Sequence, residues 1–350
     1  MATVRDVCSS IFQKLVAGTN LELAKYPKVR VYLSREEHNA LASQIKILST
    51  YVFNKDICFV LLDYAADAYF LTIGIENEIS TTNVVACENV KELSMISISE
   101  SQISRLQTMT ESTLINNIFV DSNVENVEWS TIEPFFPSVM TYKVNNPVGP
   151  SLEERNAALK HLVLYALVCS PEILILPFDK QTLQEYDNLL NIGDKNIPED
   201  NLIHSLASNY WRFCYFDIYR CIERLYVLGW VHNFKTNLAS SLPIADLHSV
   251  LKEKYNIKAG VEIHENTNIE YLFSLLPPSI NNILDPVRNG KRQDNYIYHL
   301  RNIIVHFQKN EAELESITDT QWNIIIRFLL SAIRYLYPMF GTYINALPDE

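Results

Sequence analysis

The sequence predicts an α+β protein in which a mixed α/β domain, residues 1–197, precedes an all-α helical bundle, residues 198–345. Three observations indicate this class. Runs of β-branched and aromatic residues that fit strands lie in the first half of the chain, a polar stretch at 191–201 follows them, and nearly everything beyond it has helical spacing. A chain of 350 residues is long enough for two domains with a sizeable core in each.

The first domain combines helical and strand patterns. Residues 35–52 have helical spacing, whereas ICFVLLDY (57–64) and AYFLTIGIE (68–76) are β-branched and aromatic runs that fit paired strands. Residues 90–120 have helical spacing over part of their length. The segment VEWSTIEPFFPSVMTYKV (127–144) alternates and contains prolines, which indicates edge strands.

A helical connector, residues 150–190, follows these strands. It starts with a helix over 151–170 that has Ser151 as its N-cap and glutamates in its first turn. The polar stretch NIGDKNIPEDN (191–201) comes next, and its Pro198 suits the start of a new helix. We therefore place the domain boundary between residues 197 and 198.

The second domain is predicted to be a bundle of about five helices. Pro277 and Pro278 end the third of them, because proline cannot continue a helix. The predicted helices cover residues 201–230, 244–257, 269–276, 294–308 and 318–340.

Charge and composition exclude several classes of protein. The net charge is −12, of which residues 198–350 carry about −3, from 14 Lys and Arg against 17 Asp and Glu. A protein that binds nucleic acid mainly through broad phosphate neutralisation should be basic, so any nucleic acid must be bound at a local site. With only 8 glycines and no P-loop or GxGxxG pattern, a glycine-rich phosphate site is not expected.

The cysteines and the apolar runs suggest a reduced, cytoplasmic protein without a membrane span. None of the six cysteines has CxxC spacing, and Cys214 and Cys221 lie two helical turns apart, too far to bridge. The longest apolar runs are broken by charged residues and prolines before ~20 residues. His232, His248 and His264 lack ligand spacing with a nearby Cys or carboxylate, so we expect no metal and no cofactor.

The helix predicted over 294–308, which contains YIYHLRNIIVHFQ, combines an apolar stripe with three polar residues. At ~100° per residue, its apolar side chains gather on one side, which we expect to be core. These are Ile297, Leu300, Ile303, Ile304 and Phe307.

Arg301 lies at one edge of this stripe, and Asn302 and His306 lie near the other edge. Arg301 and His306 are therefore ~140° apart and bracket a second face centred on Tyr298 and Val305. A two-fold axis near that face would bring two copies of the three residues around one cleft. The planar guanidinium of arginine can donate two hydrogen bonds to a phosphate, and histidine can accept or donate a proton near neutral pH. These residue types therefore suffice to cleave RNA without a metal.

The simpler interpretation is structural. Arg301 would then pair with Asp294 or Glu223, and His306 would be an ordinary histidine on a helix surface. An arginine and a histidine five residues apart on a helix are usually of this kind.

The segment YHLRNIIVH resembles the R-N-x3-H signature of the HEPN family (higher eukaryotes and prokaryotes nucleotide-binding), with Arg301, Asn302 and His306 at the motif positions. The upstream segment YFDIYRCIERLYVLG (215–229) resembles the tyrosine- and glutamate-containing helix of that family. The resemblance covers roughly residues 198–345, under half of the chain.

The resemblance implies a metal-independent endoribonuclease that acts as a homodimer through the motif helix. Arg301 and His306 would be catalytic, Asn302 would assist, and Glu223 would hold Arg301 in place across the bundle. The alternative for Glu223 is a solvated pair with Arg220. Many members are toxins of toxin–antitoxin pairs or effectors of antiviral defence and abortive infection, so RNA (tRNA included) and an antitoxin or sensor protein are the expected partners.

Other residues near the motif are weaker candidates. Arg288, Lys291 and Arg292 form a basic patch before the motif helix that could attract RNA, although a solvated loop is the simpler interpretation. Tyr298 could stack on an unpaired base, or belong to the core or an interface. His299 could be a second proton carrier.

Two other functions stay open from the sequence. The bundle could be a non-catalytic module for dimerisation or nucleotide binding, in which the three motif residues are relics or structural. It could also bind or modify a nucleotide without cutting a chain. Residues 1–197 carry no catalytic pattern, and we expect them to sense a trigger, bind a partner or restrain the bundle.

Overall fold

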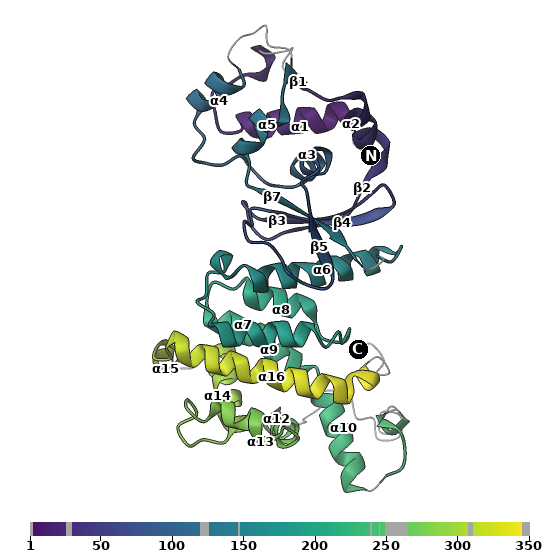
Figure 1. The fold of residues 1–350 in the computed structure, drawn as a ribbon. Helices are drawn as coiled ribbons and strands as arrows, with labels where there is room; N and C mark the ends of the chain where they lie inside the picture. Colours follow the sequence, from purple (N-terminus) through teal and green to yellow (C-terminus); the bar gives the residue numbers. More distant parts are fainter. Residues whose placement is uncertain are drawn as a thin grey trace. The chain divides into compact units, whose positions relative to one another are not determined.

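The computed structural model describes residues 3–25, 30–119, 126–145, 148–238, 240–244, 246–248, 265–306 and 311–344. It divides into two compact units, Met1–Ile173 and Leu174–Glu350 (Figure 1). The first unit is α+β and the second is helical, as the sequence predicts.

The first unit is built on a five-stranded antiparallel sheet. Its strand order is β2-β3-β4-β7-β5, and the strands are β2 Ile45–Val52, β3 Cys58–Tyr64, β4 Asp67–Ile73, β7 Val139–Val144 and β5 Val84–Cys87. Strands β3 and β4 form a hairpin whose turn residues, Ala65 and Ala66, both have positive φ, as in a tight hairpin turn. A separate parallel pair joins β1 (Arg30–Val31) to β6 (Asn126–Val127).

Helices cover the sheet of the first unit on both faces. Helix α6 (Leu152–Cys169) packs against β2, β3 and β4, and α3 (Lys91–Glu100), which packs on α1 (Val4–Val16), covers the other face (Figure 1). Ser151 caps α6 through a hydrogen bond from the Glu154 amide, as predicted. The unit also contains α2 Arg35–Asn39, α4 Glu111–Asn117, α5 Trp129–Ile132 and the short turns η1 Leu23–Lys25, η2 Ala40–Gln44, η3 Glu133–Phe135 and η4 Pro171–Ile173.

Two of the predictions for the first unit were wrong in part. The helix expected over 35–52 is helical only to Gln44, and the rest is strand β2, because IKILSTYV is rich in β-branched residues and pairs along β3. In 127–144, β7 is not an edge strand but lies between β4 and β5. Both prolines of that segment, Pro134 and Pro137, precede β7, so its amides stay available for pairing on both sides.

The second unit packs its helices around α9 (Trp211–Glu223) and the long α16 (Asp319–Ile344). Figure 1 shows α16, in yellow, alongside α7 and α9. The other elements are α7 Lys180–Leu190, α8 Glu199–Leu206, α10 Tyr226–Asn237, α12 Glu265–Ser274, α13 Pro278–Asn281, η5 Asn282–Leu284, α14 Gln293–His306 and α15 Glu311–Glu315.

The unit boundary and the helix lengths differ from the predictions. The division falls after Ile173 rather than after 197, because α7 packs against α16: Asn323 accepts a hydrogen bond from the Asp179 amide and donates one to the Pro177 carbonyl. The helix expected over 201–230 is three helices, with breaks at 207–210 and 224–225. Most of the helix predicted at 244–257 lies outside the described residues.

A candidate active site on helix α14

Helix α14 follows a tight turn and buries the stripe that the sequence predicts. Asn289 and Gly290, just before it, have φ angles of 49° and 76°, the left-handed region that favours these two residue types. Ile297, Leu300 and Ile303 are buried, which confirms the core side of the helix. Ile304 is half-buried, and Phe307 lies outside the described residues.

Arg301 is held by side chains from two positions. Its Nη2 lies 3.4 Å from Oε1 of Glu223, the last residue of α9, and its Nη1 donates to Oδ1 of Asn302 at 3.2 Å. Only 13% of the Arg301 side chain and 29% of the Glu223 side chain are exposed. The contact that the resemblance implies, from the upstream helix to the motif arginine, is therefore present in the structure.

A column of buried tyrosines lies beside this ion pair. The Tyr215 hydroxyl donates to the Ile297 carbonyl of α14 at 2.6 Å, the Tyr215 and Tyr219 rings stack, and the Tyr219 and Tyr226 hydroxyls are hydrogen-bonded. Burial raises the pKa of Tyr215 and of Tyr226 far above the ordinary value, so both stay protonated. The surroundings of Arg301 are thus of low polarity, which strengthens its attraction to anions.

The other residues of interest on α14 are His306 and the tyrosines and valine near it and Arg301. His306 is the last residue of α14, and its side chain lies outside the described residues. Tyr298 and Val305, on the face between Arg301 and His306, are half-buried. Tyr296 is buried, and burial raises its pKa to about 12.

The predicted basic patch is neutralised by neighbouring carboxylates. Each of its three cations forms an ion pair: Arg288 with Asp285 at 2.7 Å, Lys291 with Glu313 at 3.8 Å, and Arg292 with Glu270 at 2.5 Å and with Asp294 at 3.1 Å. Because these carboxylates cancel much of the positive charge, the patch attracts a phosphate backbone less than its sequence suggests.

His299 shares one of those carboxylates. Its Nε2 lies 2.9 Å from Glu313, the residue that also pairs with Lys291. The histidine side chain therefore faces α15.

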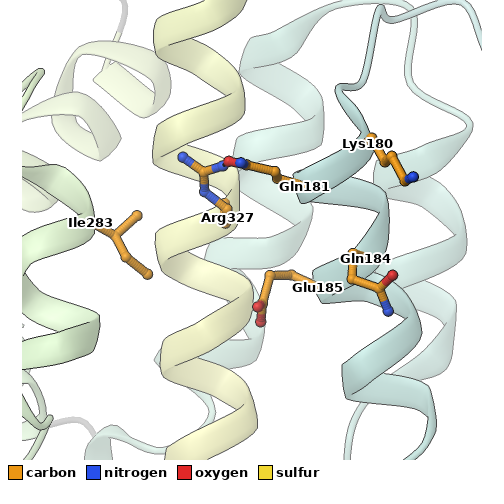
Figure 2. A pocket seen from close by; sticks show the side chains of 6 residues that line it. All are labelled: Lys180, Gln181, Gln184, Glu185, Ile283 and Arg327. Atoms are coloured by element: carbon orange, nitrogen blue, oxygen red, sulfur yellow. The ribbon is translucent and has the colours of Figure 1, made fainter.

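One groove in the second unit lies away from the motif. A groove of about 650 Å³ runs between α7, α16 and η5 (Figure 2). Arg327 and Gln181 meet across it through a hydrogen bond, as Figure 2 shows. It is lined by Lys180, Gln181, Gln184, Glu185, Ile283 and Arg327, and no motif residue is among them.

Two groups of aromatic residues on α9 and next to its ends were not expected from the sequence. The first is the column of Tyr215, Tyr219 and Tyr226, which links α9 to α14 and which the i, i+4 spacing of the first two could have indicated. The second is Tyr210 and Phe213, two aromatic residues that are 58% and 49% exposed.

No family model matches the chain, and searches of curated proteins and of solved structures find no match either. In the part of the chain that the structure describes, no helix is both long and apolar enough to cross a membrane. Within the same residues, no three His, Cys, Asp or Glu side chains gather as metal ligands would.

Proposed function

We propose that the protein is a metal-independent endoribonuclease of the HEPN type, with Arg301, Asn302 and His306 as its catalytic residues. The 2′-hydroxyl oxygen attacks the adjacent phosphorus, the bond to the 5′-oxygen breaks, and the products carry 2′,3′-cyclic phosphate and 5′-hydroxyl ends. An imidazole of His306 takes the 2′-hydroxyl proton or protonates the leaving 5′-oxygen, and Arg301 stabilises the charge on the phosphoryl oxygens.

The observation that carries the proposal is the anchoring of Arg301 by Glu223. A guanidinium that stabilises a transition state must be fixed before the substrate arrives, and here a carboxylate from another helix fixes it. The buried tyrosines beside it lower the local polarity, so that charge stabilisation is larger than in water. By analogy with the HEPN family, we propose that it acts as a toxin or an antiviral effector.

Cleavage of total RNA and of a tRNA pool, with a chelator present, tests the proposal. The wild-type protein is expected to cut, and Arg301→Ala and His306→Ala are each expected to lower the rate by a factor of about 100 or more. Two exposed residues provide matched controls, Arg35→Ala on α2 and His204→Ala on α8, which should keep the wild-type rate. Equal rates in all four variants would overturn the assignment.

The proposed active form is a homodimer through the α14 face that carries Tyr298 and Val305. Two copies would bring Arg301 of one chain and His306 of the other to one phosphate. A mixture of Arg301→Ala and His306→Ala chains, co-expressed so that mixed dimers form, should then recover part of the activity. If a mixture that is shown to contain mixed dimers recovers no cleavage activity, the two chains do not share one cleft.

A specific observation favours the alternative of binding without cleavage. Arg301 contacts both Glu223 and Asn302, and the nearby patch is paired with carboxylates, an arrangement that is also typical of a purely structural arginine. In that case the folded protein binds RNA or a nucleotide and leaves it intact in the cleavage assay.

A further inference from the structure

The solvent-facing side of α9 carries aromatic rings interleaved with arginines. The guanidinium carbon of Arg212 lies 5.4 Å from the Tyr210 ring centre and 4.9 Å from that of Phe213, and Arg220 lies 4.7 Å from the Phe216 ring centre. We call these five residues the α9 stripe. Tyr210, Phe213 and Arg220 are exposed, and Arg212 and Phe216 are half-buried. Exposed aromatic side chains paired with arginines are uncommon, because large aromatic side chains are usually buried.

Helical geometry explains why the stripe is continuous. At ~100° per residue, positions 212, 213, 216 and 220 fall within about 100° of one another, so their side chains share one face. The opposite face packs in the core through Cys214, Tyr215, Ile218, Tyr219, Cys221 and Ile222. The stripe is therefore a surface that core packing does not require.

The charge of this face differs from that of the chain. Along the same side of α9 lie Arg224 and, at the end of the helix, Glu223 with Arg301. Together with Arg212 and Arg220 there are four arginines, against the two carboxylates of Asp217 and Glu223. In a chain of net charge −12, this side of α9 therefore carries more positive than negative side chains of its own.

We propose that the α9 stripe binds single-stranded RNA and leads it towards Arg301. Unpaired bases stack on aromatic rings and on guanidinium planes, and arginines also contact the phosphates between them. From Phe213 to Glu223 the helix rises about 15 Å, a path for a few nucleotides that ends at the Arg301 ion pair. The choice of RNA as ligand rests on the proposed function.

A protein partner is the main competing occupant, since Tyr and Arg are also frequent at the centres of protein interfaces. Acidic residues are depleted at such centres, whereas here Asp217 directly follows Phe216 on α9. Alternating rings and cations match the alternating bases and phosphates of a single strand, so the charge pattern favours RNA.

Binding of a fluorescein-labelled 15-nucleotide oligoadenylate, followed by anisotropy, tests the stacking contacts. All variants are made in full-length His306→Ala protein, so that the probe is not cut. Phe213→Ala and Tyr210→Ala should each raise Kd at least about 5-fold. Tyr335→Ala, which removes another tyrosine that is 40% exposed, should leave Kd unchanged. Equal Kd values for all of these proteins would overturn the proposal.

The salt dependence of Kd tests the phosphate contacts. Each phosphate contacted by a cation contributes about 0.7 to the slope of log Kd against log salt for a single strand, so Arg220→Gln should lower that slope by about this amount. Arg35→Gln, which removes an exposed arginine of α2 in the first unit, serves as the matched control and should not change it. A loss of slope in Arg35→Gln but not in Arg220→Gln would refute the α9 stripe.

The outcomes separate this inference from the proposed function. Wild-type cleavage with unchanged binding by Phe213→Ala refutes the stripe and leaves the nuclease standing. Oligoadenylate binding that depends on Phe213, in a protein that does not cut, supports the stripe and refutes the nuclease. Unchanged RNA binding together with a loss of self-association in Phe213→Ala would make the stripe a protein interface and overturn the RNA assignment.

Discussion

Replacing Glu223 with glutamine tests how firmly the fold holds Arg301. The contribution of the Glu223–Arg301 ion pair to the free energy of unfolding should lie between two known cases. Exposed ion pairs contribute about 0–1 kcal/mol, and breaking a fully buried pair costs about 3–5 kcal/mol. With 13% of Arg301 and 29% of Glu223 exposed and the nearest atoms 3.4 Å apart, we expect Glu223→Gln to lower the free energy of unfolding by about 1–2 kcal/mol.

A double-mutant cycle isolates the interaction itself. Glu223→Gln, Arg301→Gln and the double variant are unfolded in urea, and tryptophan fluorescence reports the transition. A Trp129→Phe background leaves Trp211, Trp230 and Trp322, all in the second unit, so the signal follows the unit that contains the pair.

We expect a coupling energy of about 1 kcal/mol between Glu223 and Arg301. Lys291 and Glu313, 3.8 Å apart with 47% and 38% of their side chains exposed, form the matched control, for which the coupling should be below about 0.5 kcal/mol. Couplings of equal size in the two pairs would refute the view that partial burial makes Glu223 the anchor of Arg301.

Three further predictions concern a buried hydroxyl, the cysteines and His232. Tyr337→Phe should cost about 1 kcal/mol of stability in urea unfolding, because the hydroxyl donates to the Cys221 carbonyl at 2.9 Å inside the core; an unchanged midpoint would contradict this. Alkylation of the native protein at pH 8, mapped by mass spectrometry, should label exposed Cys87 first and spare Cys214 and Cys221, since burial raises the pKa of Cys221 to about 12. Burial lowers the pKa of His232, so the unfolded chain binds a proton at this side chain more readily than the folded protein does. The free energy of unfolding should therefore fall as the pH drops below about 6.5. In His232→Phe this fall should be smaller.

The strands of the first unit show where sequence patterns succeed. The runs that became β3 and β4 are unbroken β-branched and aromatic segments, and their pairing follows directly. Strand β2 was missed because it directly follows the helical residues 35–44, so that a window covering both has helical spacing. The break at 224–225 contains neither glycine nor proline, so nothing local marks it.

The candidate site was predictable only in part. The core stripe of α14 follows from periodicity, and the contact between Glu223 and Arg301 was expected from the resemblance rather than from any spacing. Exposure of Tyr210 and Phe213 could not be predicted, because an aromatic residue in a helix is normally core, and which face of α9 is covered depends on distant helices. The neutralisation of Arg292 by Glu270 likewise joins residues far apart in the sequence.

The chemistry of the cut ends tests the central claim most directly. Wild-type protein is incubated with a defined single-stranded RNA and a chelator, and the product ends are identified by mass spectrometry. We expect 2′,3′-cyclic phosphate and 5′-hydroxyl ends, which disappear when Arg301 or His306 is replaced with alanine. Products with 3′-hydroxyl and 5′-phosphate ends, or cutting that persists in both variants, would contradict it.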